Sequence, residues 1–208
     1  MYSQRLLHCL SLLLGVYWVL SPLPAQASTY NVSMDTSPIS GGSFSVVFDL
    51  IDGDGVTNNQ INLSNFLGFG NPLTSPNYLG GAAGDLSSAV LLNDSIFLNE
   101  FVQGFMASNL LSFSVDLTTN FAGGNPDSFV FLLLDSGGNT IPTQDPLGTD
   151  AFLSIDIGPG APVIQTYGTA LGTGVNLGPP TVTSVPEPIS LVLLVTGLVG
   201  LGIVRKQA

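Results

Sequence analysis

Several runs of this chain strictly alternate apolar and polar residues, and this pattern restricts the folds that the chain can adopt. Residues 111–117 alternate four apolar with three polar residues, and residues 42–50 and 151–157 follow a similar pattern. A period of two residues is that of a β-strand with one buried face. Clusters of Gly, Asn and Pro separate these runs and predict turns between the strands.

The segment 28–168 contains further strand signals and no convincing helix. Residues 128–134 are almost wholly apolar, which predicts a central strand covered on both faces. Residues 162–167 predict an edge strand, residues 68–84 a long irregular loop, and residues 169–184 a flexible linker rich in Gly, Thr and Pro. About seven to nine short strands without an internal repeat favour one antiparallel β-sandwich over 28–168. We therefore predict an all-β, jelly-roll-like domain.

The first residues, 1–27, have the parts of a secretory signal peptide. Arg5 is the only charged residue before an apolar stretch at 10–20. Ala25 and Ala27 then form a small-x-small cleavage site. We expect cleavage after Ala27, and a retained N-terminal anchor is the alternative.

The last residues, 185–208, have three parts in order. A Pro-Glu-Pro step is extended, because proline fixes φ and restricts the residue before it. The uncharged apolar run 189–204 predicts a transmembrane helix of about 24 Å, which local thinning of the bilayer accommodates. The basic tail 205–208 would remain in the cytoplasm under the positive-inside rule, with the preceding chain outside. A buried core helix is the alternative.

This tripartite tail resembles the PEP-CTERM sorting signal of exported Gram-negative proteins. The resemblance implies recognition by an exosortase, a membrane-embedded cysteine protease that cuts near the motif and releases the protein or transfers it to the surface. Residues 48–55 with 58–59, and residues 99–105 leading to 111–113, also look like a domain common in one family of PEP-CTERM proteins, which implies no activity. The sorting resemblance is carried by Pro186, Glu187 and Pro188, the run 189–204, and the basic residues Arg205 and Lys206.

Basic residues and cysteine are missing from the predicted domain. The three Lys and Arg residues, the single His and the single Cys all lie in the predicted signal peptide or tail. All fourteen acidic residues except Glu187 lie in the segment 28–184. Such an anionic domain repels nucleic acid, and it lacks the residues of Ser-His-Asp and Cys-His catalysis, of zinc fingers and of disulfides. Hard cations such as Ca²⁺ remain as charge partners.

An acidic turn between two predicted strands is the candidate metal site. Counted from Asp52, the segment is no EF-hand, because Thr57 stands where that loop requires glycine. A looser calcium site would combine the Asp52 and Asp54 carboxylates with the carbonyls of Asn58 or Asn59. The alternative is an Asx-type turn without metal, and we expect no other cofactor.

Two other patterns suggest carbohydrate chemistry. Glu100 is the only Glu of the domain, and paired carboxylates hydrolyse glycosides, but the sequence places no second acid opposite it. A solvated acid at a strand edge is the alternative. Tyr30, Tyr78 and Tyr167 suggest a platform on which sugar rings stack, although they are scattered along the chain.

These features lead us to expect an exported protein without catalytic activity. Its tail would first hold it at the inner membrane, and it would then reach the cell surface or the extracellular matrix after exosortase processing. The alternative is a β-sandwich module that binds carbohydrate, such as exopolysaccharide, with calcium as a stabilising ion. A hydrolase using Glu100 is the third hypothesis.

Overall fold

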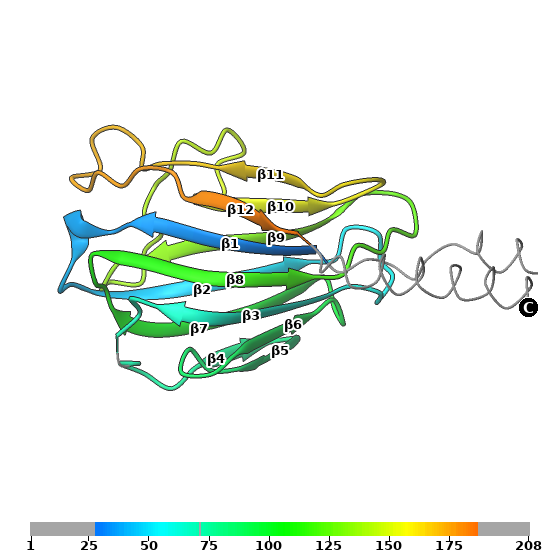
Figure 1. Cartoon of the computed structure of the whole chain (residues 1–208), viewed down its shortest axis with the longest axis horizontal. Coiled ribbons are helices and arrows are strands. Elements are labelled where there is room, and N and C mark those ends of the chain that lie inside the picture. The colour runs from blue at the N-terminus through cyan, green and yellow to red at the C-terminus, as the bar shows by residue number, and fades with distance from the viewer. Residues whose placement is uncertain (1–27, 71, 187–208) are drawn as a thin grey trace, which may run out of the picture.

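The computed structural model describes residues 28–70 and 72–186, which form two antiparallel sheets packed face to face (Figure 1). In this part of the chain the only helix is one short 3-10 turn, η1 (Ser37–Ile39). The predicted antiparallel β-sandwich is confirmed for these residues. Sheet A contains, in spatial order, β12 (Thr181–Val185), β1 (Ser28–Asp35), β8 (Leu110–Leu117), β3 (Gln60–Leu67), β6 (Val90–Asn93) and β5 (Gly81–Gly84). Sheet B contains β11 (Val163–Thr166), β10 (Leu153–Ile157), β9 (Asp127–Leu134), β2 (Ser43–Ile51), β7 (Leu98–Met106) and β4 (Asn77–Leu79).

The strictly alternating runs form strands because each presents one apolar face to the opposite sheet. In β8 the side chains of Leu111, Phe113, Val115 and Leu117 are buried in the space between the sheets. Their polar neighbours on β8 lie on the other face of sheet A, as a period of two residues requires. The expectation of a half-buried strand is therefore confirmed here and for β10, whereas in β2 Val47 is buried on the outer face as well.

Phenylalanine side chains fill the centre of the core. Phe48 on β2 is fully buried, and its ring centroid lies 5.2 Å from that of Phe113 on sheet A. The same ring lies 5.7 Å from Phe131 and 6.1 Å from Phe101, both on neighbouring strands of sheet B. Offset and edge-on pairs at these distances add to the stability that apolar burial supplies.

Strand β9 is covered on both faces, as its continuous apolar sequence predicts. Phe129, Phe131 and Leu133 point into the main core. Val130 and Leu132 point the other way, where they form a second cluster on the outer face of sheet B. Each of these two side chains is only 7% exposed.

Neither predicted terminal segment falls among the described residues. The signal peptide at 1–27 and the apolar run at 189–204 both lie outside them. Within the described part, no helix has the length and apolarity needed to cross a membrane.

The expected irregular loop at 68–84 is wrong in its second half. Strand β4 pairs with β7 at the edge of sheet B, and β5 pairs with β6 at the edge of sheet A. Gly80 connects the two strands with a φ of +62°. Both edge strands are short, and β5 consists only of Gly and Ala, so neither has the alternation that identifies a half-buried strand.

The expected flexible linker at 169–184 is also wrong, because this segment belongs to the sandwich. Its last residues form most of β12, which pairs with β1 and lets Val182 pack against the core. Leu177 is 1% exposed, and the Thr169 backbone N–H donates to its carbonyl oxygen at 2.9 Å. Pairing uses the backbone, so a stretch of Thr and Ser can complete a sheet without an apolar pattern.

One end of the sandwich holds both ends of the described chain. Ser28 pairs with Leu117, and Thr29 pairs with Val185, so β1 begins where β12 ends (Figure 1). The strand register brings the loops 52–59, 94–97 and 118–126 to the same end. We call this end, defined by Ser28, Val185 and these three loops, the terminal end.

Candidate metal site at the terminal end

In the loop between β2 and β3 two Asp side chains accept nearby backbone N–H groups, and Asp54 forms an Asx turn. Asp52 Oδ1 accepts the Gly55 backbone N–H at 2.6 Å, and Asp54 Oδ1 accepts the Val56 N–H at 2.8 Å. Gly55 has a φ of +75°, a conformation that favours glycine. The predicted turn is thus present, and it directs two carboxylates to one side of the loop.

A third carboxylate, Asp127 at the start of β9, completes the cluster. One oxygen each of Asp52, Asp54 and Asp127 lies within 4.8 Å of the other two. Asp127 is 1% exposed, and its Oδ1 accepts the Gly53 N–H at 2.8 Å. At Gly53 a Cβ atom would lie 2.0 Å from the Pro126 carbonyl oxygen, so only glycine lets the two loops approach this closely.

Sequence reasoning missed Asp127, because it follows Asp54 only after several intervening strands. The local signal is weak: an acid directly after a Gly-Gly-Asn-Pro turn and directly before an apolar strand. Only the pairing of β2 with β9 brings it beside the first loop.

Asn58, the predicted third ligand, does lie against the cluster. Its Nδ2 donates to Asp54 Oδ2 at 3.4 Å. Its Oδ1 is buried and has no hydrogen-bond partner. The neighbouring Asn59 instead serves the fold, because its Nδ2 donates to Asp127 Oδ2 at 2.6 Å and to the Asn120 carbonyl oxygen at 2.7 Å.

The negative charge of the Asp cluster is not balanced by any nearby positive charge of the described residues. Burial raises the pKa of the Asp127 carboxyl, with hydrogen bonds from Asn59 and from the Gly53 backbone opposing the rise. The Ala122 backbone N–H holds the pKa of Asp54 below its usual value, so this carboxylate stays charged. The described residues include no Lys, Arg or His to neutralise them. Chemically, the arrangement suits a hard cation bound by oxygen atoms.

Glu100 does have an acid opposite it, which the sequence did not indicate. Asp49 on β2 and Glu100 on β7 are directly paired on the outer face of sheet B. Burial, and then the charge of Glu100, raise the pKa of Asp49 to about 7. Apolar side chains of the outer cluster, among them Val47 and Val102, lie on the same face. The pair therefore sits on a sheet surface.

The three tyrosines do not form one platform. Tyr30 points into the core and is 9% exposed. Tyr78 packs on the Phe101 ring at the β4 edge, and its hydroxyl donates to the Gly84 carbonyl oxygen at 2.6 Å. Tyr167 packs against the outer cluster of sheet B. The expectation of a shared stacking surface is wrong, because the three side chains lie on different faces.

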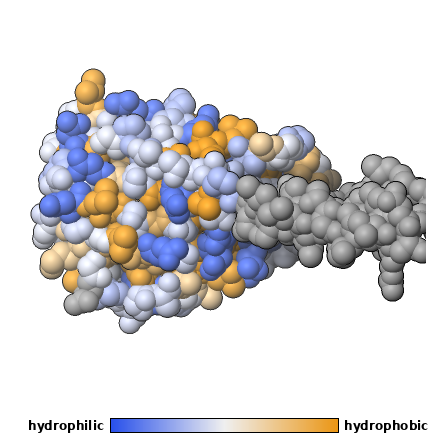
Figure 2. Space-filling view, in the orientation of Figure 1, coloured by the Kyte–Doolittle hydropathy of each residue, from blue (hydrophilic) through white to orange (hydrophobic). Residues whose placement is uncertain are grey.

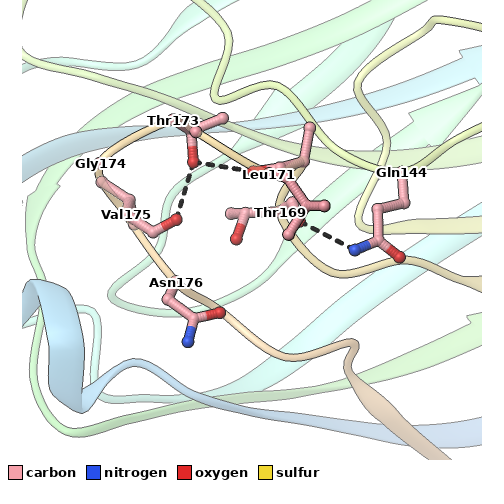
Figure 3. Close-up of a pocket in the computed structure, with 9 residues that line it drawn as sticks. Gln144, Thr169, Leu171, Thr173, Gly174, Val175 and Asn176 are labelled. Atoms are coloured by element: carbon pink, nitrogen blue, oxygen red, sulfur yellow. Dashed lines mark hydrogen bonds between the residues drawn. The ribbon is translucent and has the colours of Figure 1, made fainter.

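A hollow of about 290 Å³ lies within the loop 169–176, lined also by Gln144 (Figure 3). Its polar groups largely bond to one another. Thr173 Oγ1 donates to the Val175 carbonyl oxygen at 2.7 Å, and Gln144 Nε2 donates to the Thr169 carbonyl oxygen at 3.2 Å. The lining contains no aromatic or charged side chain, so it offers little to hold a ligand.

The predicted sorting and cleavage residues lie almost entirely outside the described part. Pro186 is the last described residue and directly follows β12. The other predicted residues, outside the described range, are Ala25, Ala27, Glu187, Pro188, Arg205 and Lys206.

Comparison of the chain with family models, with curated proteins and with solved structures finds no match.

Proposed function

We propose that this chain is an exported protein of the cell surface or extracellular matrix, without catalytic activity of its own. The segment 1–27 directs export, and the segment 185–208 holds the protein at the inner membrane. An exosortase then recognises Pro186, Glu187 and Pro188. The apolar run and the basic pair of the tail, together with the cleavage site of the leader, support this assignment.

The observation that carries the proposal is that all the described strands lie between the predicted cleavage site and the predicted Pro-Glu-Pro motif. Ser28, the first residue after the predicted cleavage site, begins β1 at the terminal end. Val185, the residue before the predicted motif, ends β12 at the same place. The described sandwich thus lies between the predicted leader and Pro186, and loss of the leader and of the residues beyond the motif would leave every described strand in the product.

Exposed apolar side chains at the terminal end support a position near a membrane. Phe97 is 73% exposed, Ile96 47% and Val56 45%, and all three belong to loops of this end. The short distance in sequence from Val185 to the predicted span would hold these loops close to the bilayer surface. Apolar side chains are favoured at such an interface.

The finer assignment of a jelly roll is supported by the strand order. Strands β1 to β4 alternate between the two sheets, and so do strands β6 to β9. Repeated crossing between sheets is how two Greek keys build a jelly roll. Strands β10 and β11 then widen sheet B, and β12 widens sheet A.

The proposal is tested by fractionation of the producing cells and by the intact mass of the exported form. We expect a product that begins at Ser28 and has lost the residues beyond the motif. A double variant, Pro186→Ala with Pro188→Ala, should remain membrane-bound with its tail intact, while Asp135→Asn should be processed normally. Finding the full-length chain in the cytosol, with residues 1–27 present, would refute the proposal.

Binding of exopolysaccharide is the second candidate, favoured by the outer face of sheet A. Asn65 Nδ2 donates to Ser114 Oγ at 3.1 Å, and Ser114 Oγ donates to Asn31 Oδ1 at 2.9 Å across three strands. Figure 2 shows polar side chains mixed with apolar ones on the face that Figure 1 presents. Amides and hydroxyls of this kind hydrogen-bond sugars. Co-sedimentation with the organism's own exopolysaccharide that is lost in Asn31→Ala would support this candidate.

A further inference from the structure

We propose that the outer edge of β12 binds the same strand of a second copy of this chain, antiparallel and centred on Thr183, and that this pairing requires release of the tail from the membrane. The second part of the inference rests on the proposed function, because it needs both an anchored and a released form. The first part rests on the sandwich alone. Self-association is the kind of interaction that a protein of the extracellular matrix needs.

Strand β12 is the last strand of sheet A, and among the described residues no strand pairs with its outer edge. On its inner side it pairs with residues 29–33 of β1. Val182 packs against the core and holds β12 in this register, while the other four residues of the strand are exposed. The outer edge therefore presents backbone N–H and C=O groups to solvent, where they form a template for a further strand.

The other three edges of the two sheets carry features that discourage such pairing. Strand β4 has three residues and directly follows Pro76. Strand β5 consists of Gly and Ala, and Gly84 within it has a φ of +105°. Strand β11 has four residues, directly follows Pro162 and pairs beside Asp156 of β10. Short strands, proline and charge are the usual protections of a sheet edge.

The sequence of β12 contains none of these protections. Four of its five residues are β-branched, and it has no charged residue, Gly or Pro. The residues 29–33 of β1, with which it pairs, are uncharged as well. High β-propensity combined with low charge is the composition that favours association of strands from different chains.

The distribution of charge selects the partner. The domain contains acids and no basic residue, so it repels an acidic strand, and a basic strand finds no acid on this edge. An uncharged, β-branched strand fits the edge, and β12 itself is such a strand. A two-fold axis at Thr183 would place Thr183 opposite its own copy and Thr181 opposite Val185. Cross-strand pairs of β-branched side chains stabilise antiparallel strands.

The antiparallel arrangement decides when two copies can meet. Each β12 ends at the terminal end of its own sandwich, and the predicted span at 189–204 follows shortly after Pro186. In the antiparallel pair the two tails leave in opposite directions, whereas copies anchored in one bilayer present their tails to the same side. Residues 187 and 188 reach only about 7 Å when extended, too little to reverse the direction of a tail. Anchored copies therefore cannot pair, and removal of the tail permits pairing.

Association is measured by light scattering after size exclusion, on the full-length chain in nonionic detergent, which does not confine the tails to one plane. The interface is small, so we expect a dimer with a dissociation constant on the order of 10⁻⁵ M. Thr183→Lys and Thr183→Asp each place like charges opposite one another and should weaken dimerisation at least about tenfold. An equimolar mixture of the two variants should restore the dimer, because the facing charges are then opposite.

Gln165→Lys is the matched control, because Gln165 is exposed on β11, an edge strand of the other sheet. It should dimerise like the wild type. The mixture also separates loss of pairing from loss of the fold, since variants with a damaged fold would not regain the dimer when mixed.

Oxidative cross-linking of Thr183→Cys tests the role of the tail. The segment 28–184 contains no cysteine, so a cross-link reports contact between the two copies at position 183. It should form in detergent and be at least about tenfold less efficient in phospholipid nanodiscs that hold two chains, although a shared disc raises the local concentration. Gln165→Cys should give only the low yield of random collisions in both, and any cross-link through Cys9 of an uncleaved leader would appear there too.

A wild type that stays monomeric at about 10⁻⁴ M would overturn the pairing. So would a Thr183→Lys response equal to that of Gln165→Lys, or a mixture of the two Thr183 variants that stays monomeric. An efficient cross-link in nanodiscs would overturn the dependence on release. None of these results bears on export, which fractionation tests separately. Conversely, a cytosolic, uncleaved chain would refute export, while light scattering would still decide the pairing of β12.

Discussion

Replacing Asp49 by Asn should stabilise the protein above neutral pH and leave its stability nearly unchanged in acid. Asp49 faces Glu100 directly across β2 and β7, and its Oδ1 is buried without a partner. Burial, and then the Glu100 charge, raise its pKa from 3.8 to about 7. Asn has nearly the same shape and carries no charge at any pH.

The size of the effect follows from the pKa difference between the folded and unfolded chain. Between about pH 4 and pH 7 the folded state keeps a proton on Asp49 that the unfolded state has lost, so the free energy of unfolding falls as the pH rises. At about 1.4 kcal/mol per pKa unit the full shift corresponds to about 4 kcal/mol. Water reaches part of the Asp49 side chain and screens it, so we expect a gain of about 2 kcal/mol for Asp49→Asn near pH 8.

Urea unfolding followed by far-ultraviolet circular dichroism measures this difference, on the full-length chain in nonionic detergent with EDTA, from about pH 4 to about pH 8. Asp135→Asn is the control, because the Asn139 backbone N–H lowers the Asp135 pKa. The contribution of Asp135 to the pH dependence of stability therefore has the opposite sign. That variant should lose stability above pH 4 relative to the wild type. If Asp49→Asn differs from the wild type by the same amount in acid and in base, the argument from burial and like charge is refuted.

Two other predictions test the core and the boundary of the domain. Phe48→Ala should lower the free energy of unfolding by about 3–5 kcal/mol in the same urea titration, because it removes the ring that packs against both sheets. Phe97→Ala is the control: the Phe97 side chain is 73% exposed, and its loss should change the free energy of unfolding by less than about 0.5 kcal/mol. A chain that ends at Pro180 lacks β12, and its free energy of unfolding should be lower by about 2 kcal/mol. A chain that ends at Pro186 keeps β12 and should unfold at the same temperature as the full-length chain. Equal unfolding midpoints for the two shortened chains would show that β12 contributes nothing to the sandwich.

The sequence predicted those strands whose side chains meet the core. The alternation in 111–117 predicts one buried face, and the continuous apolar run in 128–134 predicts two. Strands β8 and β9 have these buried faces. Strand β12 could not be predicted in this way. Its residues are mostly exposed, and it forms because β1 offers a free backbone edge, which no local pattern of side chains records.

The candidate site was predictable only where it is local. Asp52, Asp54 and Asn58 lie within one turn, and their proximity follows from the loop itself. Asp127 and the pairing of Asp49 with Glu100 depend on which strands become neighbours. Such register is a property of the whole sheet, so a list of acids in the sequence does not identify the ones that meet.

In a domain without basic side chains, the hydrogen bonds and the burial of each carboxylate distinguish an ordinary turn from a candidate site. Asp35, Asp85 and Asp135 each accept hydrogen bonds from residues two to four positions later, and these bonds lower their pKa values. Local bonds of this kind stabilise the charge where it stands. Burial instead raises the pKa values of Asp49 and Asp127, each of which has another acid beside it. Asp49 is therefore expected to keep its proton up to about pH 7. Asp127 instead lies beside the carboxylates of Asp52 and Asp54. Because the two acids lie at separate places, Asp52→Asn should leave the pH-dependent difference in stability between the wild type and Asp49→Asn unchanged in the same urea titration.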